Sequence, residues 1–261
     1  MYTTSKATLS VKIGNVLSNN FQSDLGVYQG DVLSPISFDM YIDDVTKCFD
    51  GKCAPPTVED MDLSCLLYAD DIVLMSTTEE GLQQSVHKLS LYCNEWDLKV
   101  NVGKTKVVIF NKGGKLINAK ITLDGQLLES KESYKYLGLI FAINGKMSAA
   151  KCDLGKRGLK ALFKMKMMFK NASISFETLM HLFDHITKPI LLYASDVWGA
   201  SLLKKGHLNL NTLCHDDIEN CHLLCCRNAL GVSKKAPIVG IYGETGRFPL
   251  AIEAIVNAAK Y

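Results

Sequence analysis

The stretch LLYADDIVLMS, residues 66–76, places two adjacent aspartates, Asp70 and Asp71, in a run that is otherwise almost wholly apolar and predicts buried structure. The apolar residues on either side predict two short strands, 66–69 and 72–75, with both aspartates at the tight turn that joins them. Adjacent carboxylates repel each other and are costly to desolvate unless a cation neutralises them. The pattern favours a Mg²⁺ site, because Mg²⁺ binds through one or two carboxylates and takes its other ligands from water and phosphates. The alternative is a plain turn, since Asp is a common turn residue.

Strand and helix patterns alternate on both sides of this stretch. Residues 7–27 predict two short strands around a turn at Asn19-Asn20, and the periodicity from Thr78 to Trp96 predicts an amphipathic helix. Asp124-Gly125 predicts a hairpin turn, and YKYLGLIF (residues 134–141) predicts a strand. From residue 151 the pattern is mostly helical. The predicted fold class is α+β, with an antiparallel sheet that has helices on one face, followed by a helical region.

The composition is that of an ordinary globular protein. The chain has 261 residues, of which 48% are hydrophobic and 21% are charged. No apolar run approaches the roughly 18 residues of a membrane span, and the first residues do not resemble a secretory signal. We therefore expect an intracellular protein of the cytoplasm or nucleus, without a membrane partner. The nine cysteines predict free thiols. CHDDIENCHLLCC (residues 214–226) lacks zinc-ligand spacing, so an amphipathic helix ending at Gly231 is favoured over a zinc site.

Charge is distributed unevenly along the chain. Residues 1–100 contain 6 lysines against 15 acidic residues, whereas the other 161 residues contain 23 basic against 12 acidic residues. This asymmetry suggests a cation site in the first part and a surface for a polyanion in the second, although two solvated faces would explain it equally well. Residues 151–170 contain seven basic residues and one aspartate, with a basic stripe along the predicted helix at Lys156, Lys160 and Lys164.

Tyr68-Ala69-Asp70-Asp71 resembles the YxDD box of reverse transcriptases, and the neighbouring boxes follow in that family's order. Upstream, residues 26–45 resemble the box written (R)QGxxLSPxLF. Downstream, residues 98–110 resemble the lysine-bearing box and residues 134–141 the primer-grip box. ITKPILLYASDVWG (residues 186–199) and YGETGRFPL (residues 242–250) are similar to segments beyond the palm in LINE-type, non-LTR retrotransposon polymerases. The matching positions in the three flanking boxes are Gln29, Gly30, Leu33, Ser34, Pro35 and Phe38; Asn101, Lys104 and Thr105; and Tyr136, Leu137 and Gly138.

The resemblance implies an RNA-directed DNA polymerase that uses an RNA template, a DNA primer and dNTPs, with two Mg²⁺ ions as cofactors. It implies that Asp70 and Asp71 hold the ions and that Lys104 acts on the leaving pyrophosphate. Tyr68, Gln29 and Gly30 would contact the primer end, template and incoming nucleotide, and Tyr136, Leu137 and Gly138 would grip the primer. The second region would be a thumb that contacts the duplex through Lys156, Arg157, Lys160 and Lys164.

The same resemblance implies three parts: a partial palm at residues 1–146, a thumb-like helical region at 147–200 and a helical post-thumb segment at 201–261. The family carries a third catalytic carboxylate in a stretch similar to FxDxxKAFD before the QG box, and no match precedes residue 29 here. DVTKCFD (residues 44–50) echoes that stretch but follows the box. We therefore expect a palm-to-thumb fragment that lacks the fingers and is inactive alone. The alternatives are a catalytically dead nucleic-acid-binding module and a decayed retroelement remnant.

Overall fold

The structure is a computed structural model that describes residues 7–23, 30–169, 174–202 and 216–260. By its internal contacts the chain forms two units. Unit 1 consists of Met1–Val107 and Asn118–Glu129, and unit 2 consists of Val108–Ile117 and Ser130–Tyr261. The three-part division at residues 146 and 200 stays a prediction.

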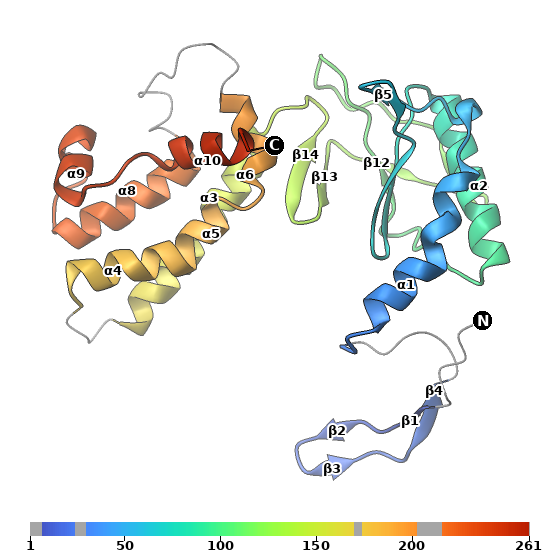
Figure 1. The fold of residues 1–261 in the computed structure, drawn as a ribbon, viewed down its shortest axis with the longest axis horizontal. Coiled ribbons are helices and arrows are strands. Elements are labelled where there is room, and N and C mark those ends of the chain that lie inside the picture. Colours follow the sequence, from blue (N-terminus) through green and yellow to red (C-terminus); the bar gives the residue numbers. More distant parts are fainter. Residues whose placement is uncertain (1–6, 24–29, 170–173, 203–215, 261) are drawn as a thin grey trace. The chain divides into compact units, whose positions relative to one another are not determined.

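The strands of unit 1 pair as short antiparallel hairpins (Figure 1). The fold class α+β is confirmed, but the described strands pair only two by two and do not form one extended sheet. The first turn was predicted at Asn19-Asn20 and instead contains Gly14, which has φ +61°, because glycine adopts this conformation without steric cost. The pairs are β1 (Ala7–Leu9) with β4 (Phe21–Ser23), β2 (Lys12–Ile13) with β3 (Val16–Leu17), β5 (Thr57–Val58) with β6 (Met61–Asp62), β7 (Cys65–Tyr68) with β8 (Asp71–Leu74), and β10 (Thr122–Leu123) with β11 (Gln126–Leu127).

Strand β9 (Lys106–Val107) pairs with β12 (Glu129–Ser130). The turn between β10 and β11 confirms the predicted hairpin, because Asp124 has φ +50° and Gly125 has φ +77°. Both values lie in the left-handed region that such two-residue turns require.

Helix α2 (Glu79–Glu95) organises the core of unit 1 and confirms the predicted helix. It begins where the Thr78 hydroxyl accepts a hydrogen bond from the Gly81 amide, which satisfies one of the unpaired donors at a helix start. Its buried face packs with Val45 and with the inner face of β7 and β8. Preceding it are α1 (Ser34–Ile42), η1 (Asp43–Cys48) and η2 (Gly51–Cys53).

The described residues of unit 2 are mostly helical and include one hairpin, β13 (Ser133–Tyr136) with β14 (Leu139–Ala142) (Figure 1). None of the helices that the structure describes is long and apolar enough to cross a membrane. The helices are α3 (Ser148–Met168), α4 (Phe176–Leu182), the π-helical turn η3 (Phe183–Thr187), α5 (Lys188–Leu191), α6 (Ser195–Trp198), η4 (Gly199–Leu202), α8 (Asp217–Leu230), α9 (Ile238–Thr245) and α10 (Leu250–Ala258).

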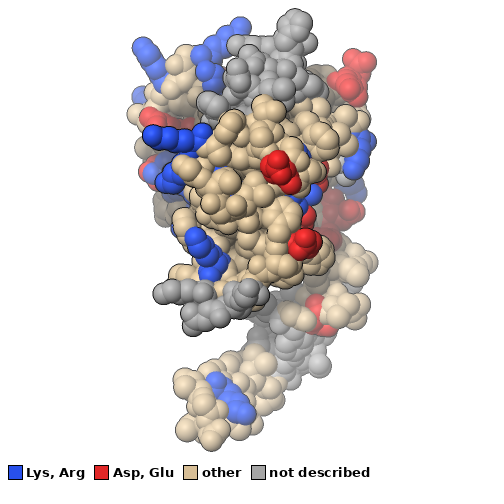
Figure 2. All heavy atoms as spheres, turned by 90° about the vertical axis from the view of Figure 1, so that its left-hand side faces the viewer, with Lys and Arg blue, Asp and Glu red and all other residues tan. Residues whose placement is uncertain are grey.

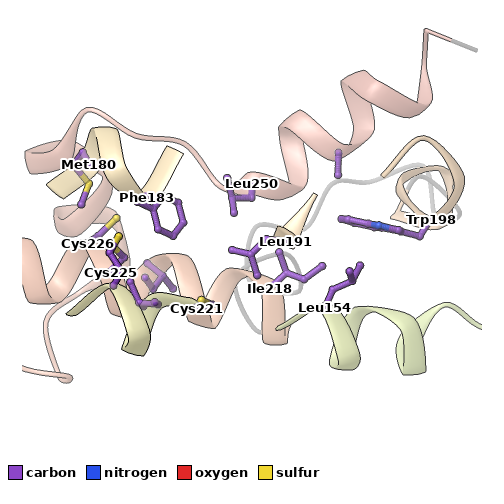
Figure 3. Packing of buried hydrophobic residues seen from close by; sticks show 14 of the residues in the cluster. Leu154, Met180, Phe183, Leu191, Trp198, Ile218, Cys221, Cys225, Cys226 and Leu250 are labelled. Carbon is purple, nitrogen blue, oxygen red and sulfur yellow. The ribbon is translucent and has the colours of Figure 1, made fainter. Parts of the chain in front are cut away.

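The core of unit 2 lies where α3 packs on α8 (Figure 3). Leu154 of α3, Ile218 of α8, and Leu191 and Trp198 of the intervening segments are each at most 2% exposed. The two helices approach so closely at Gly155 that an added Cβ would lie 2.6 Å from the Cβ of Asp217. This contact accounts for a glycine in the middle of a helix, where glycine otherwise costs stability.

Helix α8 forms as predicted and ends at Gly231, which has φ +66°. Its cysteines Cys221, Cys225 and Cys226 point into the apolar core (Figure 3). Burial raises the pKa of Cys221 and of Cys225 to about 12, so neither thiol is poised to ionise near neutral pH. Cys214, the first cysteine of the cluster, lies outside the described residues.

A buried carboxylate ties three helices of unit 2 together. Glu219 of α8 is 1% exposed. Its Oε1 is 2.7 Å from Nδ1 of His222 and accepts a 2.5 Å hydrogen bond from the Tyr242 hydroxyl of α9. Its Oε2 accepts a 2.7 Å hydrogen bond from the Leu250 amide at the start of α10. Both oxygens are therefore satisfied, which a buried charge requires.

Arg247 extends this network. Its guanidinium lies 3.4 Å from Nε2 of His222 and forms an ion pair with Asp184 of η3. Tyr242, Arg247 and Leu250 all belong to the segment YGETGRFPL, so this stretch closes the helical unit by polar contacts as well as by packing.

Candidate active site

The two aspartates lie at the end of the β7–β8 hairpin, but they occupy different positions in it. Tyr68 pairs with Asp71, so Asp71 is the first residue of β8 and only Asp70 lies in the turn with Ala69. Ala69 has φ +48°, which is uncommon for a residue with a side chain and reflects the tightness of a two-residue turn. The prediction that both aspartates occupy the turn is therefore wrong for Asp71.

The aspartates are exposed, which corrects the expectation of burial. Side chains alternate along a strand, so Leu67 and Ile72 face α2 while Tyr68 and Asp71 share the opposite face. Tyr68 is 63% exposed on that face. Within the described part of the chain, neither Asp70 nor Asp71 makes a side-chain hydrogen bond or an ion pair. Both carboxylates are thus free to take ligands from outside the protein.

The donor chemistry of this hairpin fits a hard divalent cation, which the reverse-transcriptase family generally uses. Two exposed carboxylates are the oxygen ligands that such an ion prefers, and water or phosphate would complete its shell. Among the described residues no group of three or more His, Cys, Asp or Glu side chains is arranged to hold a metal ion. The hairpin by itself therefore offers two of the oxygen ligands that such an ion would take.

Lys104 lies in a loop of unit 1 that Asn101 organises. The Lys104 amide donates 3.1 Å hydrogen bonds to the backbone oxygen and to Oδ1 of Asn101. The amide and the hydroxyl of Thr105 donate to the same backbone oxygen at 3.0 and 2.9 Å. The Lys104 side chain is exposed and makes no ion pair with another described residue. The three matching positions of the lysine-bearing box thus form one local turn that presents an ammonium group.

The QG box is described only in part. Gln29 lies outside the described residues. Gly30 is exposed and has φ +92°, a conformation that only glycine adopts without strain.

The aspartates of DVTKCFD (residues 44–50) have internal partners. Asp44 accepts a 2.6 Å hydrogen bond from the Tyr92 hydroxyl, and burial together with this bond raises the pKa of Tyr92. Asp50 forms a 2.7 Å ion pair with Lys88, whose hydrogen bond lowers the pKa of Asp50. Both carboxylates join the segment after α1 to α2, which favours the structural interpretation of DVTKCFD.

The primer-grip box forms the β13–β14 hairpin of unit 2, although the sequence predicts a single strand there. Leu137 and Gly138 make the turn, with φ +44° and +82°. The Tyr193 hydroxyl donates a 2.7 Å hydrogen bond to the Leu137 carbonyl, and Arg157 Nη2 donates a 2.9 Å hydrogen bond to the Gly138 carbonyl. Two side chains from distant segments thus hold the tip of this hairpin.

Replacing Tyr193 by phenylalanine should loosen the hairpin tip without unfolding the unit. Loss of one partly exposed hydrogen bond should cost about 0.5–1.5 kcal/mol. Hydrogen exchange of the Tyr136 and Leu139 amides should accelerate in the variant, while the amides of α8 keep their protection. Unchanged exchange in the hairpin would show that the Tyr193 hydroxyl does not hold it.

The residues predicted to contact nucleic acid differ in exposure. Lys156, Lys160 and Lys164 are exposed along one side of α3, and no side-chain partner for them lies among the described residues. Arg157 is half-buried, and its Nε lies 3.1 Å from Asp153 in an ion pair. Sequence reasoning missed Tyr193 as a partner of the hairpin. The only available signal was its position inside ITKPILLYASDVWG.

Comparisons with known proteins agree with these features. Residues 2–141 match the family described as reverse transcriptase (RNA-dependent DNA polymerase). The probable RNA-directed DNA polymerase from transposon BS of Drosophila melanogaster is 29% identical over 189 residues, 67% of this chain and 20% of the relative. The RNA-directed DNA polymerase from mobile element jockey of the same species is 23% identical over 223 residues, 80% of this chain and 23% of the relative. The Pol polyprotein from retrotransposable element R2 of Popillia japonica is 24% identical over 153 residues, 56% of this chain and 25% of the relative.

This chain spans about a fifth to a quarter of the length of these curated relatives. The family match covers more than half of the chain and includes the Asp70–Asp71 hairpin, the Lys104 loop and the Leu137-Gly138 turn. The similarity to jockey and R2 confirms the resemblance to polymerases of LINE-type retrotransposons. The chain belongs to the reverse transcriptase (RNA-dependent DNA polymerase) family.

Proposed function

We propose that this chain forms part of an RNA-directed DNA polymerase that adds deoxynucleotides to a primer 3′ end on an RNA template. The observation that carries the proposal is the pair of free, exposed carboxylates, Asp70 and Asp71, at the end of a hairpin within the family match. Mg²⁺ ions bound there would stabilise negative charge on the attacking and leaving oxygens. The roles of the two aspartates are to hold such ions and to fix their place relative to the primer end.

Lys104 would act on the leaving pyrophosphate. An exposed ammonium on a flexible stem can neutralise developing charge or give up a proton to the leaving oxygen. The Asn101 turn supports this role, because it fixes the backbone from which Lys104 projects. Tyr68 would pack near the primer end, and Gln29 with Gly30 would lie against the template and the incoming nucleotide.

The β13–β14 hairpin would position the primer through Tyr136, Leu137 and Gly138. Tyr193 and Arg157 donate hydrogen bonds to the carbonyls of this turn. We therefore assign them the role of positioning the hairpin tip. Arg157 then differs from Lys156, Lys160 and Lys164, whose ammonium groups remain available for phosphates.

The exposed lysines of α3 would contact the duplex backbone. Lys156, Lys160 and Lys164 recur every four residues, which places them on one stripe of the helix. Figure 2 shows basic side chains at several places around the edge of the face turned to the viewer, with acidic side chains among them. Binding through such a stripe is independent of sequence and weakens with salt.

Replacing Lys156, Lys160 and Lys164 by glutamate should weaken binding of an RNA–DNA duplex at least about tenfold. The slope of log affinity against log salt concentration should fall by about 2–3, because each phosphate contact releases a counterion. Fluorescence anisotropy between 50 and 200 mM salt measures both quantities. The control is Lys112→Glu with Lys234→Glu and Lys235→Glu, which changes net charge equally at exposed sites outside α3. Equal loss in the control would show that only net charge matters.

This binding surface also favours a second function, a nucleic-acid-binding module without catalysis. The two functions share the α3 stripe and differ in the need for a third carboxylate, which we propose must come from outside this chain. For either function, we propose that the protein acts in the cytoplasm or nucleus, where RNA and DNA occur.

Primer extension distinguishes the two functions. In a chimera, this chain would replace the matching segment of the transposon BS polymerase, which supplies the remaining polymerase segments. Mg²⁺-dependent extension of a DNA primer on RNA supports the polymerase. A chimera that binds the primer–template duplex with the salt dependence of the isolated chain but never extends it would support the binding module.

A further inference from the structure

A pair of histidines on the surface of unit 2 takes no part in the polymerase site. His181 belongs to the last turn of α4, and His185 belongs to the π-helical turn η3 that follows directly. Both side chains are exposed. Their ring centroids lie 4.1 Å apart with an interplanar angle of 42°. The backbone therefore holds two imidazoles next to each other in the solvent.

The tautomer of one ring follows from its hydrogen bond. Nδ1 of His185 lies 2.8 Å from the backbone oxygen of His181. A carbonyl oxygen can only accept, so Nδ1 carries the proton and Nε2 of the neutral ring keeps its lone pair. Metal-binding histidines are commonly oriented in this way, with the second ring nitrogen donating to a backbone carbonyl.

The surroundings limit the site to these two protein ligands. Glu177 lies one turn before His181, but hydrogen bonds from its own backbone and from Ser175 at the start of α4 lower its pKa and engage its carboxylate. Asp184 forms an ion pair with Arg247 instead. Water would have to fill the remaining coordination positions, which the exposure of both rings permits.

We propose that His181 and His185 chelate a transition-metal ion of the Zn²⁺, Ni²⁺ or Cu²⁺ class, with water as the other ligands. Imidazole suits these ions, whereas Mg²⁺ prefers oxygen. The site is thus chemically separate from Asp70 and Asp71. It does not depend on polymerase activity, so it can be tested on the 261-residue chain alone.

The other histidines that the structure describes provide the contrast. His87 is exposed on α2 without a second histidine beside it. His222 is 1% exposed, and both of its ring nitrogens face Glu219 and Arg247. The His181–His185 pair should therefore bind a metal ion more tightly than the single imidazole of His87.

Titration calorimetry of the untagged chain with NiCl₂, repeated with ZnCl₂, tests the site. We expect one ion per chain in the tightest phase. His181→Gln and His185→Gln should each lower affinity by at least about tenfold, equivalent to 1.4 kcal/mol. Each single variant should keep only the weak binding of one imidazole, and the double variant should lose that binding as well, because the tight phase needs both rings. His87→Gln should leave the tight phase unchanged.

Two further measurements keep the result interpretable. The melting temperature without metal should be similar for all variants, since Gln is a good helix former. In addition, His181→Gln keeps the hydrogen bond from Nδ1 of His185 to the backbone oxygen of residue 181. Electron paramagnetic resonance with Cu²⁺ should show two nitrogen ligands in the wild type and one in each single variant. Full affinity in either single variant, or a tight phase retained in the double variant, would overturn the proposal.

Discussion

Replacing Asp70 and Asp71 with asparagine should eliminate Mg²⁺-dependent primer extension by the transposon BS chimera. Neutral amides cannot hold the ions that offset charge on the attacking and leaving oxygens, so we expect a loss of at least about 10³-fold in rate. Extension of an RNA-templated DNA primer under single-turnover conditions measures this loss. The same change should leave the free energy of unfolding of the 261-residue chain unchanged or slightly raised, because it removes repulsion between two exposed, unpaired carboxylates.

The chain offers a matched control at another hairpin tip. Glu59 and Asp60 are adjacent, exposed acidic residues in the turn between β5 and β6. Glu59→Gln with Asp60→Asn removes the same two charges and should preserve extension. Mn²⁺ added to the isolated chain should broaden the amide resonances of Ala69 to Ile72, and only the Asp70–Asp71 variant should abolish this effect. Full extension by that variant would show that the two aspartates are not ligands of the catalytic ions.

Replacing Glu219 with alanine should be the most destabilising single change in unit 2. Glu219 is 1% exposed and satisfies the Tyr242 hydroxyl, the Leu250 amide and His222. Its removal takes the acceptor from the buried Leu250 amide and from Nδ1 of His222 and leaves a cavity in the core, which should cost about 3–5 kcal/mol. Urea unfolding followed by tryptophan fluorescence in a Trp96→Phe background measures the loss, because Trp198 is 1% exposed in the same core and is then the only tryptophan.

Two variants separate the network from a general effect of removing glutamate. Glu244→Ala removes an exposed carboxylate of α9 and should change the free energy of unfolding by less than about 0.5 kcal/mol. Glu219→Gln keeps one acceptor oxygen for the hydrogen bonds of the network. Its free energy of unfolding should therefore lie between those of the two alanine variants. Similar stability of the Glu219→Ala and Glu244→Ala proteins would mean that the buried network contributes little.

Local patterns in the sequence were sufficient for the elements whose geometry depends on near neighbours. Thr78 caps α2, Asp124-Gly125 turns the β10–β11 hairpin, and Gly231 ends α8. Each depends on the backbone preferences of a few consecutive residues. The apolar residues on either side of Asp70 and Asp71 likewise predicted the β7–β8 hairpin, and the helical period of residues 151–170 predicted the lysine stripe of α3. The prediction of a turn at Asn19-Asn20 is wrong, because Gly14 adopts the turn conformation at lower steric cost.

Contacts between distant segments decided the rest. The exposure of Asp70 and Asp71 depends on which face of the hairpin α2 covers, and the apolar run around them does not indicate that face. The partners of Arg157, Tyr193 and Glu219 lie far along the chain, at separations of 19, 56 and up to 31 residues. Such pairings depend on how whole helices pack. On α3, for example, Arg157 turns inward, whereas Lys156 and Lys160 stay exposed. Residue types alone therefore determined the family and the candidate ligands, whereas only the folded chain determined which side chains remain free to act on nucleic acid or metal.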